Sequence, residues 1–462
     1  MSIVASGSAA IARAAGRASR AMGRGGGTSV PGVVLLRINP RAVDTLATHL
    51  GGGTILVSAT NGKTTTTRML GGALRANGAE VITNGAGANL LSGVASALVD
   101  ARPARPETAR GLFECDEAAL PEVMARLRPR ALVLMNLFRD QLDRHGELEA
   151  ISERWQAMLL APGDLPRLIL AADDPAIAAL GGGRECLWFG LDDPAVASGA
   201  LPHAADSTRC RACSAPLTYD HVWFGHLGDW RCAACGSSRP PLDVAVIDAG
   251  LRGATGSDPR IRTPDGEVTL HLTVPGLHNV LNAAAALAGA LAMGIRADVA
   301  AAAISQVPAP FGRAEYLVVD GTDLVLLLAK NPAGANENVR TLLLDPGEHH
   351  ILVALNDRIA DGRDVSWIWD VDWEPLLPRV SSVTVTGERA HDLALRFRYG
   401  GLDPDHLHVI PDHRAALASA IAAVPPGGCL EVLPTYTAMH DIRADLVARG
   451  AASEFWDEGL RG

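Results

Sequence analysis

VSATNGKTTTT, residues 57–67, follows an apolar run at 54–57 that predicts a buried parallel strand. Residues 68–76 come after it and predict a helix, which Asn77-Gly78 would close. A Gly-Lys-Thr loop between a strand and a helix is the context of a phosphate-binding loop. The backbone N–H groups and the helix N-terminus favour polyphosphate. We expect Lys63 on an exposed loop, reaching the β- and γ-phosphates, with the Thr64 hydroxyl on Mg²⁺.

The loop departs from the general pattern, because Val57 stands where the first glycine is usual. Thr-Asn-Gly-Lys-Thr-Thr-Thr instead resembles the form found in Mur ligases and folylpolyglutamate synthases. Lys63 and Lys330 are the only lysines in the chain. A chain that uses arginine almost everywhere keeps an ammonium group here, where a compact charge suits phosphate.

Composition indicates a globular protein. The chain has 462 residues, of which 48% are hydrophobic and 20% charged, and this length suggests roughly two to four domains. The net charge of −10 argues against nucleic-acid binding, which needs a basic face. No charge-free apolar stretch reaches the roughly 18 residues that a membrane-spanning helix requires, so none is expected.

The first thirty residues contain no acidic residue and are rich in Arg, Ala and Ser. This composition is compatible with a transit peptide. We favour a helix over residues 9–22, followed by a flexible glycine-rich turn at 23–27.

Further strand–helix units follow the phosphate loop and predict a doubly wound α/β domain. Glu114 lies with two other acids at the end of the apolar run 111–113. Because the carboxyl ends of parallel strands line the ligand crevice, Glu114 is a candidate Mg²⁺ ligand opposite Thr64. The alternative is that these acids begin a helix, where they are favoured. The expected strands are 80–83, 131–135 and 167–170.

Four cysteines interrupt this pattern. Cys210-x2-Cys213 and Cys232-x2-Cys235 are separated by eighteen residues, a spacing that predicts a structural zinc ribbon. The clustering of the cysteines suggests metal binding in a reducing compartment rather than disulfide bonds. His221 and His226 lie between the two pairs. Since four thiolates complete a closed site, we expect both histidines to be ordinary surface residues.

The C-terminal third predicts a second, Rossmann-like α/β domain without a dinucleotide-binding glycine motif. Asn279 and Asn282, before it, would share one face of a helix, although an asparagine at a helix start is often only a cap. Residues 308–313 resemble a hinge that ends in Arg313. The expected strands are 324–328, 350–355, 382–385, 407–410 and 429–433.

These motifs occur in the order of a Mur ligase central domain, and the whole chain resembles the MurT family, the ligase-like subunits of lipid II isoglutaminyl synthases. The four-cysteine ribbon, the run 329–334 and the run 361–370 with Ser-Trp-Ile-Trp-Asp carry the specific likeness. The resemblance implies an N-terminal segment (1–45), an ATP-binding domain (46–308) with the ribbon inserted at about 203–240, and a Rossmann-like domain (309–462).

The resemblance also implies an activity, in which ATP activates the α-carboxyl of D-glutamate in the lipid II stem peptide as an acyl phosphate. Ammonia then gives D-isoglutamine. Lys330 would close on the transferred phosphate, Thr64 and Glu114 would hold Mg²⁺, and such clustered cations suit phosphoryl transfer. The implied ATP-binding residues, including two for adenine (Asn279 and Asn282), are Thr60, Asn61, Gly62, Lys63, Thr64, Thr65, Asn279, Asn282 and Arg313.

Two departures from the wider Mur pattern put a second Mg²⁺ site in doubt. Gln141 stands where many Mur ligases have histidine, and Arg154 lies near the place of a lysine that many carbamylate. One alternative function is a Mur-type ligase that adds an amino acid to a peptidoglycan precursor. Another is an ATP-sensing binding protein without catalysis.

The chain offers no good cysteine nucleophile for releasing ammonia from glutamine. Cys186 and Cys429 lie in apolar runs, and acidic neighbours would raise the pKa of Cys115. A separate glutaminase, GatD in the resembling family, is therefore expected as partner, and the resemblance implies that an aspartate of this chain orients the partner's histidine. Asp364 is our candidate, with Asp361 and Asp370 as alternatives, unless it is an ordinary loop carboxylate. The implied location is the cytoplasm, at the inner face of the membrane.

Overall fold

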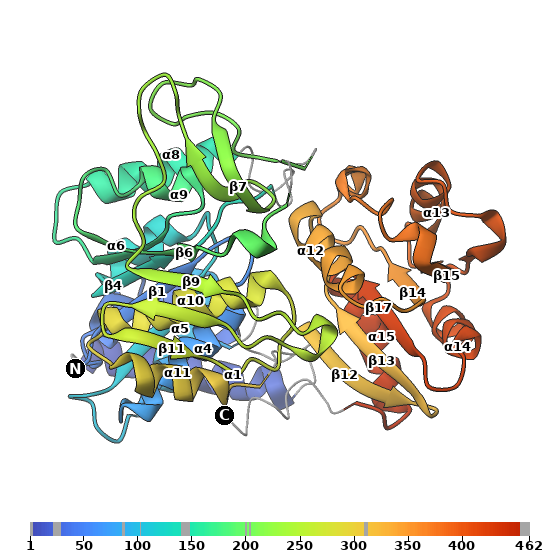
Figure 1. Cartoon of the computed structure of the whole chain (residues 1–462). Helices are drawn as coiled ribbons and strands as arrows, with labels where there is room; N and C mark the ends of the chain where they lie inside the picture. Colours follow the sequence, from blue (N-terminus) through green and yellow to red (C-terminus); the bar gives the residue numbers. More distant parts are fainter. Residues whose placement is uncertain are drawn as a thin grey trace.

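The computed structural model describes residues 3–21, 29–85, 88–101, 103–139, 148–198, 201–202, 205–308 and 313–452. Its strands form two large sheets and one small hairpin. Figure 1 shows the two sheets in two lobes that lie side by side, with α12 (Pro332–Leu343) of the second lobe facing the first. The α/β class predicted from the sequence is confirmed.

The first lobe is built on a nine-stranded sheet in the order β11-β10-β9-β6-β5-β4-β1-β3-β2. In this spatial order, every neighbouring pair from β9 across to β2 is parallel, and β10 and β11 add an antiparallel edge. β1 lies between β3 and β4 and is buried along its whole length, as expected for a central parallel strand. The strands are β1 Thr54–Ser58, β2 Val81–Thr83, β3 Arg110–Cys115, β4 Ala131–Leu134, β5 Arg167–Ala171, β6 Cys186–Leu191, β9 Val244–Asp248, β10 Arg260–Thr263 and β11 Gly266–Thr269.

Helices α4, α10 and α11 pack against one another on this sheet. Ten α-helices and two short 3₁₀ turns belong to the described part of the first lobe. They are α1 Ile3–Ala21, α2 Val30–Ile38, α3 Ala42–Ala47, α4 Lys63–Ala76, α5 Leu91–Asp100, α6 Leu120–Leu127, α8 Leu148–Leu160, α9 Pro175–Ala179, η1 Pro194–Val196, η2 Gly253–Thr255, α10 Leu277–Ala292 and α11 Ala297–Ser305.

The N-terminal segment packs into the first lobe. α1 begins earlier than the helix expected at 9–22, whose last residue, like the turn at 23–27, lies outside the described residues. Arg13 Nη1 donates to the carbonyl of Val99 at 3.0 Å. Gly32 lies so close to α5 that a Cβ there would come within 1.7 Å of the Ser92 carbonyl oxygen. Among the described helices, none is long and apolar enough to cross a bilayer.

The cysteine-rich insert forms an antiparallel hairpin of β7 (Thr218–Phe224) and β8 (Leu227–Arg231) between its two Cys-x2-Cys turns. Phe224 and Leu227 belong to the large hydrophobic core. His226 is completely buried, and its Nε2 lies 3.3 Å from an Asp174 carboxylate oxygen. The expectation of a surface residue is therefore wrong for His226, because the hairpin turn is inserted into the core of the first lobe. His221 is half-buried.

The second lobe has a six-stranded sheet in the order β12-β13-β17-β14-β15-β16, parallel except for the β12–β13 hairpin. Alternate residues of its strands enter two separate cores, one covered by α12 and α13 and the other by α14 and α15. Its elements are β12 Arg313–Val319, β13 Thr322–Leu327, α12, β14 His349–Ala354, η3 Ser366–Asp370, η4 Leu377–Arg379, β15 Val380–Thr386, α13 Ala390–Tyr399, η5 Pro404–His406, β16 Leu407–Val409, α14 His413–Ala423, β17 Cys429–Pro434 and α15 Tyr436–Ala448.

Candidate active site

The phosphate loop follows the carboxyl end of β1 and ends at Gly62, the N-cap of α4. Gly62 has a φ of 92°, in the left-handed region that favours glycine. A Cβ at this position would lie 2.0 Å from Asn282 Oδ1 and 2.9 Å from Met135 Cε. No side chain caps the start of α4. The loop therefore presents helix N–H groups in the arrangement that binds anions.

Two residues from the segment after β4 fix the shape of this loop. The Asn136 amide accepts from the backbone N–H of Asn61 at 2.9 Å and donates to its carbonyl at 3.1 Å. The Thr60 hydroxyl accepts from the backbone N–H of Phe138 at 3.0 Å. These hydrogen bonds, one buried and two partly buried, hold the loop against the segment that follows β4.

Lys63 is the first residue of α4 and not part of an exposed loop, so that expectation is wrong. Its side chain is only 11% exposed. The ammonium group donates to Glu117 Oε2 at 2.7 Å and to the carbonyl of Ala59. Burial raises the pKa of the Glu117 carboxyl, but the charges of Lys63 and Lys330 outweigh that effect and leave the pKa below its usual value.

Thr64 and Glu114 meet as expected. The Thr64 hydroxyl donates to Glu114 Oε2 at 2.8 Å. The Asn84 amide fixes the backbone of Glu114, accepting from its N–H at 3.0 Å and donating to its carbonyl at 2.8 Å. Glu114 lies in β3, and the next helix begins only at Leu120, so Glu114 does not begin a helix. Two oxygens about 2.9 Å apart fit neighbouring ligand positions on an octahedral Mg²⁺.

Asn279 and Asn282 lie buried within α10, whose N-cap is Gly276, so Asn279 is not a cap. Asn282 donates to Asn279 Oδ1 at 3.1 Å, and Asn279 donates to the carbonyl of Pro275 at 2.7 Å. The pair lies against the phosphate loop through Asn282, and its contact with adenine stays a prediction. Arg313 begins β12, but its side chain lies outside the described part of the chain. Thr65 is buried in the first turn of α4.

The second lobe reaches this loop through the residues that precede α12. Lys330 Nζ lies 3.5 Å from the carbonyl oxygen of Thr60. The amides of Asn61 and Asn331 exchange hydrogen bonds of 3.3 and 3.1 Å. The two lysines of the chain therefore approach the same loop, one from each lobe, and the charges of both act on the buried carboxylate of Glu117.

The four ribbon cysteines converge, and their sulfur atoms all lie within 4.8 Å of one another. The Sγ atoms of Cys210 and Cys235 are 3.6 Å apart, and those of Cys213 and Cys232 are 3.5 Å apart. Four thiolates about 2.3 Å from a tetrahedral zinc would be separated by about 3.8 Å. The cluster can therefore hold a metal ion of this kind.

The two Cys-x2-Cys turns have matching backbones. Ser214 N–H donates to the Cys210 carbonyl at 2.8 Å, and Gly236 N–H donates to the Cys232 carbonyl at 3.0 Å. Ser214 and Gly236 both have positive φ, at 60° and 78°. The sequence spacing thus encodes two equivalent turns that face each other across the cluster.

The remaining cysteines are poor nucleophiles. Burial, with Glu114 nearby, raises the pKa of Cys115 far above its ordinary value. Burial also raises the pKa of Cys186 to about 11 and that of Cys429 to about 12.

The described residues do not test whether a second Mg²⁺ site exists. Gln141 lies outside the described residues, and Arg154 is exposed on α8.

The three candidate aspartates have different environments. Asp364 is exposed, and its carboxylate accepts from the N–H of Ser366 at 2.9 Å, an interaction that lowers its pKa. Asp361 is buried and accepts from the N–H of Thr437 at 2.7 Å, while burial raises its pKa. Asp370 lies 3.4 Å from the Arg139 guanidinium. Of the three, Asp364 is the most accessible to another protein.

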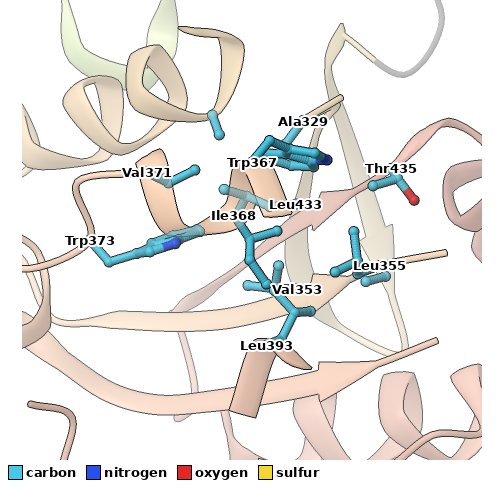
Figure 2. Close-up of a pocket in the computed structure, with 12 residues that line it drawn as sticks. Ala329, Val353, Leu355, Trp367, Ile368, Val371, Trp373, Leu393, Leu433 and Thr435 are labelled. Atoms are coloured by element: carbon cyan, nitrogen blue, oxygen red, sulfur yellow. The ribbon is translucent and has the colours of Figure 1, made fainter. Parts of the chain in front are cut away.

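Figure 2 shows an apolar pocket in the second lobe, lined in part by residues of β14 and β17. Val353 and Leu433 contribute to it from these strands, Trp367 and Ile368 come from η3, and Thr435 is polar. The cavity measures about 10 Å³, which is close to the room that one water molecule needs. It does not fit a nucleotide, and the site follows from the polar cluster around Lys63.

Sequence reasoning did not assign roles to Asn84, Asn136, Glu117, Asn331 or Arg340. Asn84 directly follows β2, Asn136 comes two residues after β4, and Glu117 comes two residues after β3. A general rule that polar residues at the carboxyl ends of parallel strands line the crevice would have marked these three. Asparagine before a helix is a usual N-cap, which is the role of Asn331 at α12. Its contact with Asn61 of the other lobe is not indicated by any neighbouring residues in the sequence.

Comparisons with known proteins agree with this geometry. The family model of the Mur ligase middle domain matches residues 57–213, and that of the MurT ligase C-terminal domain matches residues 328–439. A solved pseudomurein peptide ligase type C from Methanothermus fervidus has a TM-score of 0.66 at 19% identity, covering 86% of this chain and 78% of that chain. The MurF ligase from Thermotoga maritima, solved in complex with ADP, has a TM-score of 0.62 at 16% identity, covering 89% and 85%. These likenesses establish the Mur ligase-like fold.

A relative by sequence decides the family. The lipid II isoglutaminyl synthase (glutamine-hydrolyzing) subunit MurT of Streptococcus pneumoniae is 30% identical over 436 residues, which cover 92% of this chain and 93% of that protein. A match of this length spans both lobes of the chain. The chain belongs to the MurT family of Mur ligase-like proteins.

Proposed function

We propose that this chain is the ATP-dependent ligase subunit of a lipid II isoglutaminyl synthase, which amidates the α-carboxyl of D-glutamate in the stem peptide. The observation that carries the proposal is the approach of Lys63 and Lys330 to one loop from two lobes. Membership in the MurT family, whose relatives bear this enzyme's name, specifies the substrate. The family match also disfavours the alternative of a ligase that adds an amino acid.

The proposed reaction has two steps. A carboxylate oxygen of D-glutamate attacks the γ-phosphorus of ATP, and the bond to the β,γ-bridging oxygen breaks to release ADP. Lys63 and Lys330 stabilise the charge on the transferred phosphoryl group. Neutral ammonia then attacks the acyl phosphate carbon. Inorganic phosphate leaves, and the nitrogen loses a proton to give the amide.

Thr64 and Glu114 would hold Mg²⁺ through the two oxygens that now share a hydrogen bond of 2.8 Å. Bound there, the ion would neutralise phosphate charge and orient the γ-phosphoryl group. Asn279, Asn282 and Arg313 are proposed to contact the nucleotide beyond the phosphates.

Ammonia is proposed to come from a separate glutaminase subunit resembling GatD. The word "subunit" in the relatives' name agrees with a partner, and the described cysteines outside the metal cluster have raised pKa values. Asp364 would orient the partner's catalytic histidine. With a lipid-linked substrate, the complex would work in the cytoplasm, at the inner face of the membrane.

The decisive experiment reconstitutes the chain and its partner with lipid II, ATP and Mg²⁺. Mass spectrometry should detect loss of about one mass unit per stem peptide, the change from carboxyl to amide, with glutamine and also with ammonium salt. Supplying amino acids without either nitrogen source tests the ligase alternative. Addition of an amino-acid residue to the stem peptide would contradict the proposal.

We further propose that the cysteine cluster holds a structural zinc ion. Metal analysis of the purified chain should find about one zinc per chain. Chelation should unfold the hairpin and lower the melting temperature, since zinc binding contributes directly to folding. A fully folded, active, metal-free protein would exclude this assignment.

A further inference from the structure

One arginine of the second lobe binds the cysteine-rich insert and the segment beside it. Arg340, near the end of α12, donates through Nη1 to the carbonyl of Trp223 in β7 and through Nη2 to the carbonyl of Val196. These two acceptors belong to segments joined by the Ser198–Val222 bridge, in which Ser198 N–H donates to the Val222 carbonyl at 2.7 Å. Arg340 therefore makes a charge-assisted, two-pronged contact with one rigid feature.

The same hairpin is packed against the residue that supports the phosphate loop. Phe138 stacks on Phe224 with ring centroids 6.0 Å apart, and its ring lies 4.7 Å from that of His226. Phe138 also donates its N–H to the Thr60 hydroxyl. The indole N–H of Trp230 donates to the Ala172 carbonyl at 3.0 Å, which fastens the hairpin to the end of β5. The hairpin thus contacts both Arg340 and Phe138, the residue that bonds to the phosphate loop.

A second bridge crosses at another point of the insert. The backbone N–H of Arg139 donates to Asp206 Oδ2 at 2.9 Å, and its guanidinium also pairs with Asp206. The same guanidinium lies 3.4 Å from Asp370 of the second lobe. Asp206 precedes the first Cys-x2-Cys turn. The insert is therefore linked to the second lobe at two places, directly at Trp223 and through Arg139 at Asp206.

We propose that the cysteine-rich insert is the docking platform for the second lobe, and that Arg340 is a positioning residue that sets Lys330 over the phosphate loop. Asn331, next to Lys330, caps the start of α12, and Arg340 lies nine residues further along the helix. At about 1.5 Å per residue, the helix separates the two ends by about 14 Å and transmits position between them. The role of Lys330 rests on the proposed function, whereas the docking geometry does not.

The kinetic test compares Arg340→Ala with wild type in the complex with its partner. We expect kcat to fall roughly 10- to 100-fold with glutamine and with ammonium alike, because a small misplacement of a catalytic group has effects of this size. The dissociation constant of the nucleotide should stay within about twofold, since the phosphate loop keeps its own supports. Arg340→Lys, which retains the charge but reaches one carbonyl, should give an intermediate kcat.

Arg389→Ala is the matched control. Arg389 is also a partly exposed arginine of the second lobe, but its ion pairs are with Asp357 and Asp392 of the same lobe. It should leave kcat unchanged. If Arg340→Ala matches this control while its melting temperature equals that of wild type, the proposal is overturned.

Two further measurements separate docking from chemistry. Small-angle scattering with a non-hydrolysable ATP analogue and Mg²⁺ should show a larger radius of gyration for Arg340→Ala than for wild type, whatever the substrate. If wild type forms no amide but this difference appears, the proposed function fails and the platform stands. An unchanged radius would reject the platform even if kcat falls.

The metal cluster provides the reciprocal test. Cys213→Ser, at an exposed ligand position, should loosen the insert and reduce kcat in the same way as Arg340→Ala. If both act through docking, the double variant should lose little more than the worse single variant. If the fold-loss of kcat in the double variant equals the product of the two single losses, the insert and Arg340 act independently, contrary to the proposal.

Discussion

Two strand–loop–helix units of similar local build meet at the candidate site, yet they expose different chemistry. In the first lobe β1 leads through Gly62, with a φ of 92°, into α4, and no side chain caps that helix. In the second lobe β13 leads through Asn331, with a φ of −155°, into α12, and the Asn331 side chain accepts from the N–H of Gly334 at 2.9 Å.

The difference shows how one kind of helix start can serve two purposes. An uncapped start with a glycine offers its N–H groups to an anion. A start closed by asparagine has less to offer a ligand and instead fixes the direction of Lys330, the residue before it. The first unit is thus suited to hold the nucleotide, and the second to deliver a charge.

Breaking the first unit should have the largest effect. Lys63→Ala should reduce ATP turnover by roughly 10²–10³-fold, since electrostatic groups of this kind commonly contribute that much. It also removes the closest partner of buried Glu117, so the melting temperature should fall as well. The double variant Lys63→Ala, Glu117→Gln separates the two effects, because it should recover stability without recovering turnover. Near-normal turnover in either variant would place the nucleotide site elsewhere.

Breaking the second unit should have a smaller and more selective effect. Lys330→Ala should lower kcat roughly 10- to 100-fold while the nucleotide dissociation constant, measured by calorimetry, changes little. The reason is that Lys330 reaches the loop from the other lobe and contributes mainly when the phosphoryl group moves. Lys330→Arg is the control for charge, although the bulkier guanidinium should restore only part of the rate. An equal loss of nucleotide affinity would mean that the two units do not differ as described.

The sequence predicted the first unit better than the second, for a physical reason. The phosphate loop, the cysteine turns and the strand ends are local patterns, in which a few neighbouring residues determine the backbone. Glu114 opposite Thr64 could be expected because strand ends in a parallel sheet share one edge. The Asn61–Asn331 pair joins residues 270 positions apart, and no local spacing encodes it.

Burial was the least predictable property. His226 lies between two cysteine turns and was expected at the surface, yet it is buried because the hairpin packs into the larger lobe. Lys63 was expected to be exposed because its loop was expected to be. Its partner Glu117 was recognised only as one of three clustered acids, since nothing in the sequence shows which carboxylate turns towards the ammonium.

A third change, at Asp364 in the second lobe, should affect only one nitrogen source. With wild-type partner, Asp364→Asn should lose most glutamine-driven amidation and keep ammonium-driven amidation. The reason is that Asp364 is exposed to a partner and has no proposed contact with the nucleotide. Asp361→Asn is the comparison, since Asp361 is buried and holds Thr437, so its loss should affect stability and both nitrogen sources. Equal loss with both sources, or unchanged use of glutamine, would reject Asp364 as the orienting residue.

The smallest effect on catalysis is expected inside α12 itself, at Glu337. This buried carboxyl lies 4.0 Å from the Arg340 guanidinium, and burial raises its pKa from 4.5 to about 7 despite that charge. The folded chain therefore binds a proton that the unfolded chain has lost between these two pH values, so this group's contribution to the free energy of unfolding falls as the pH rises from about 4.5 to about 7.

Glu337→Gln replaces the carboxyl by a neutral group of the same shape and should remove that dependence. At pH 8 the free energy of unfolding of the variant, measured by urea denaturation, should exceed that of wild type by up to about 3 kcal/mol. Near pH 5 the two free energies should converge. Its kcat should change little at pH 7, because Arg340 keeps both of its carbonyl acceptors, Trp223 on the insert and Val196 in the segment beside it. If wild type and variant instead differ by the same amount at pH 5 and pH 8, Glu337 does not titrate in this range, and α12 contributes no pH dependence to the contact between the lobes.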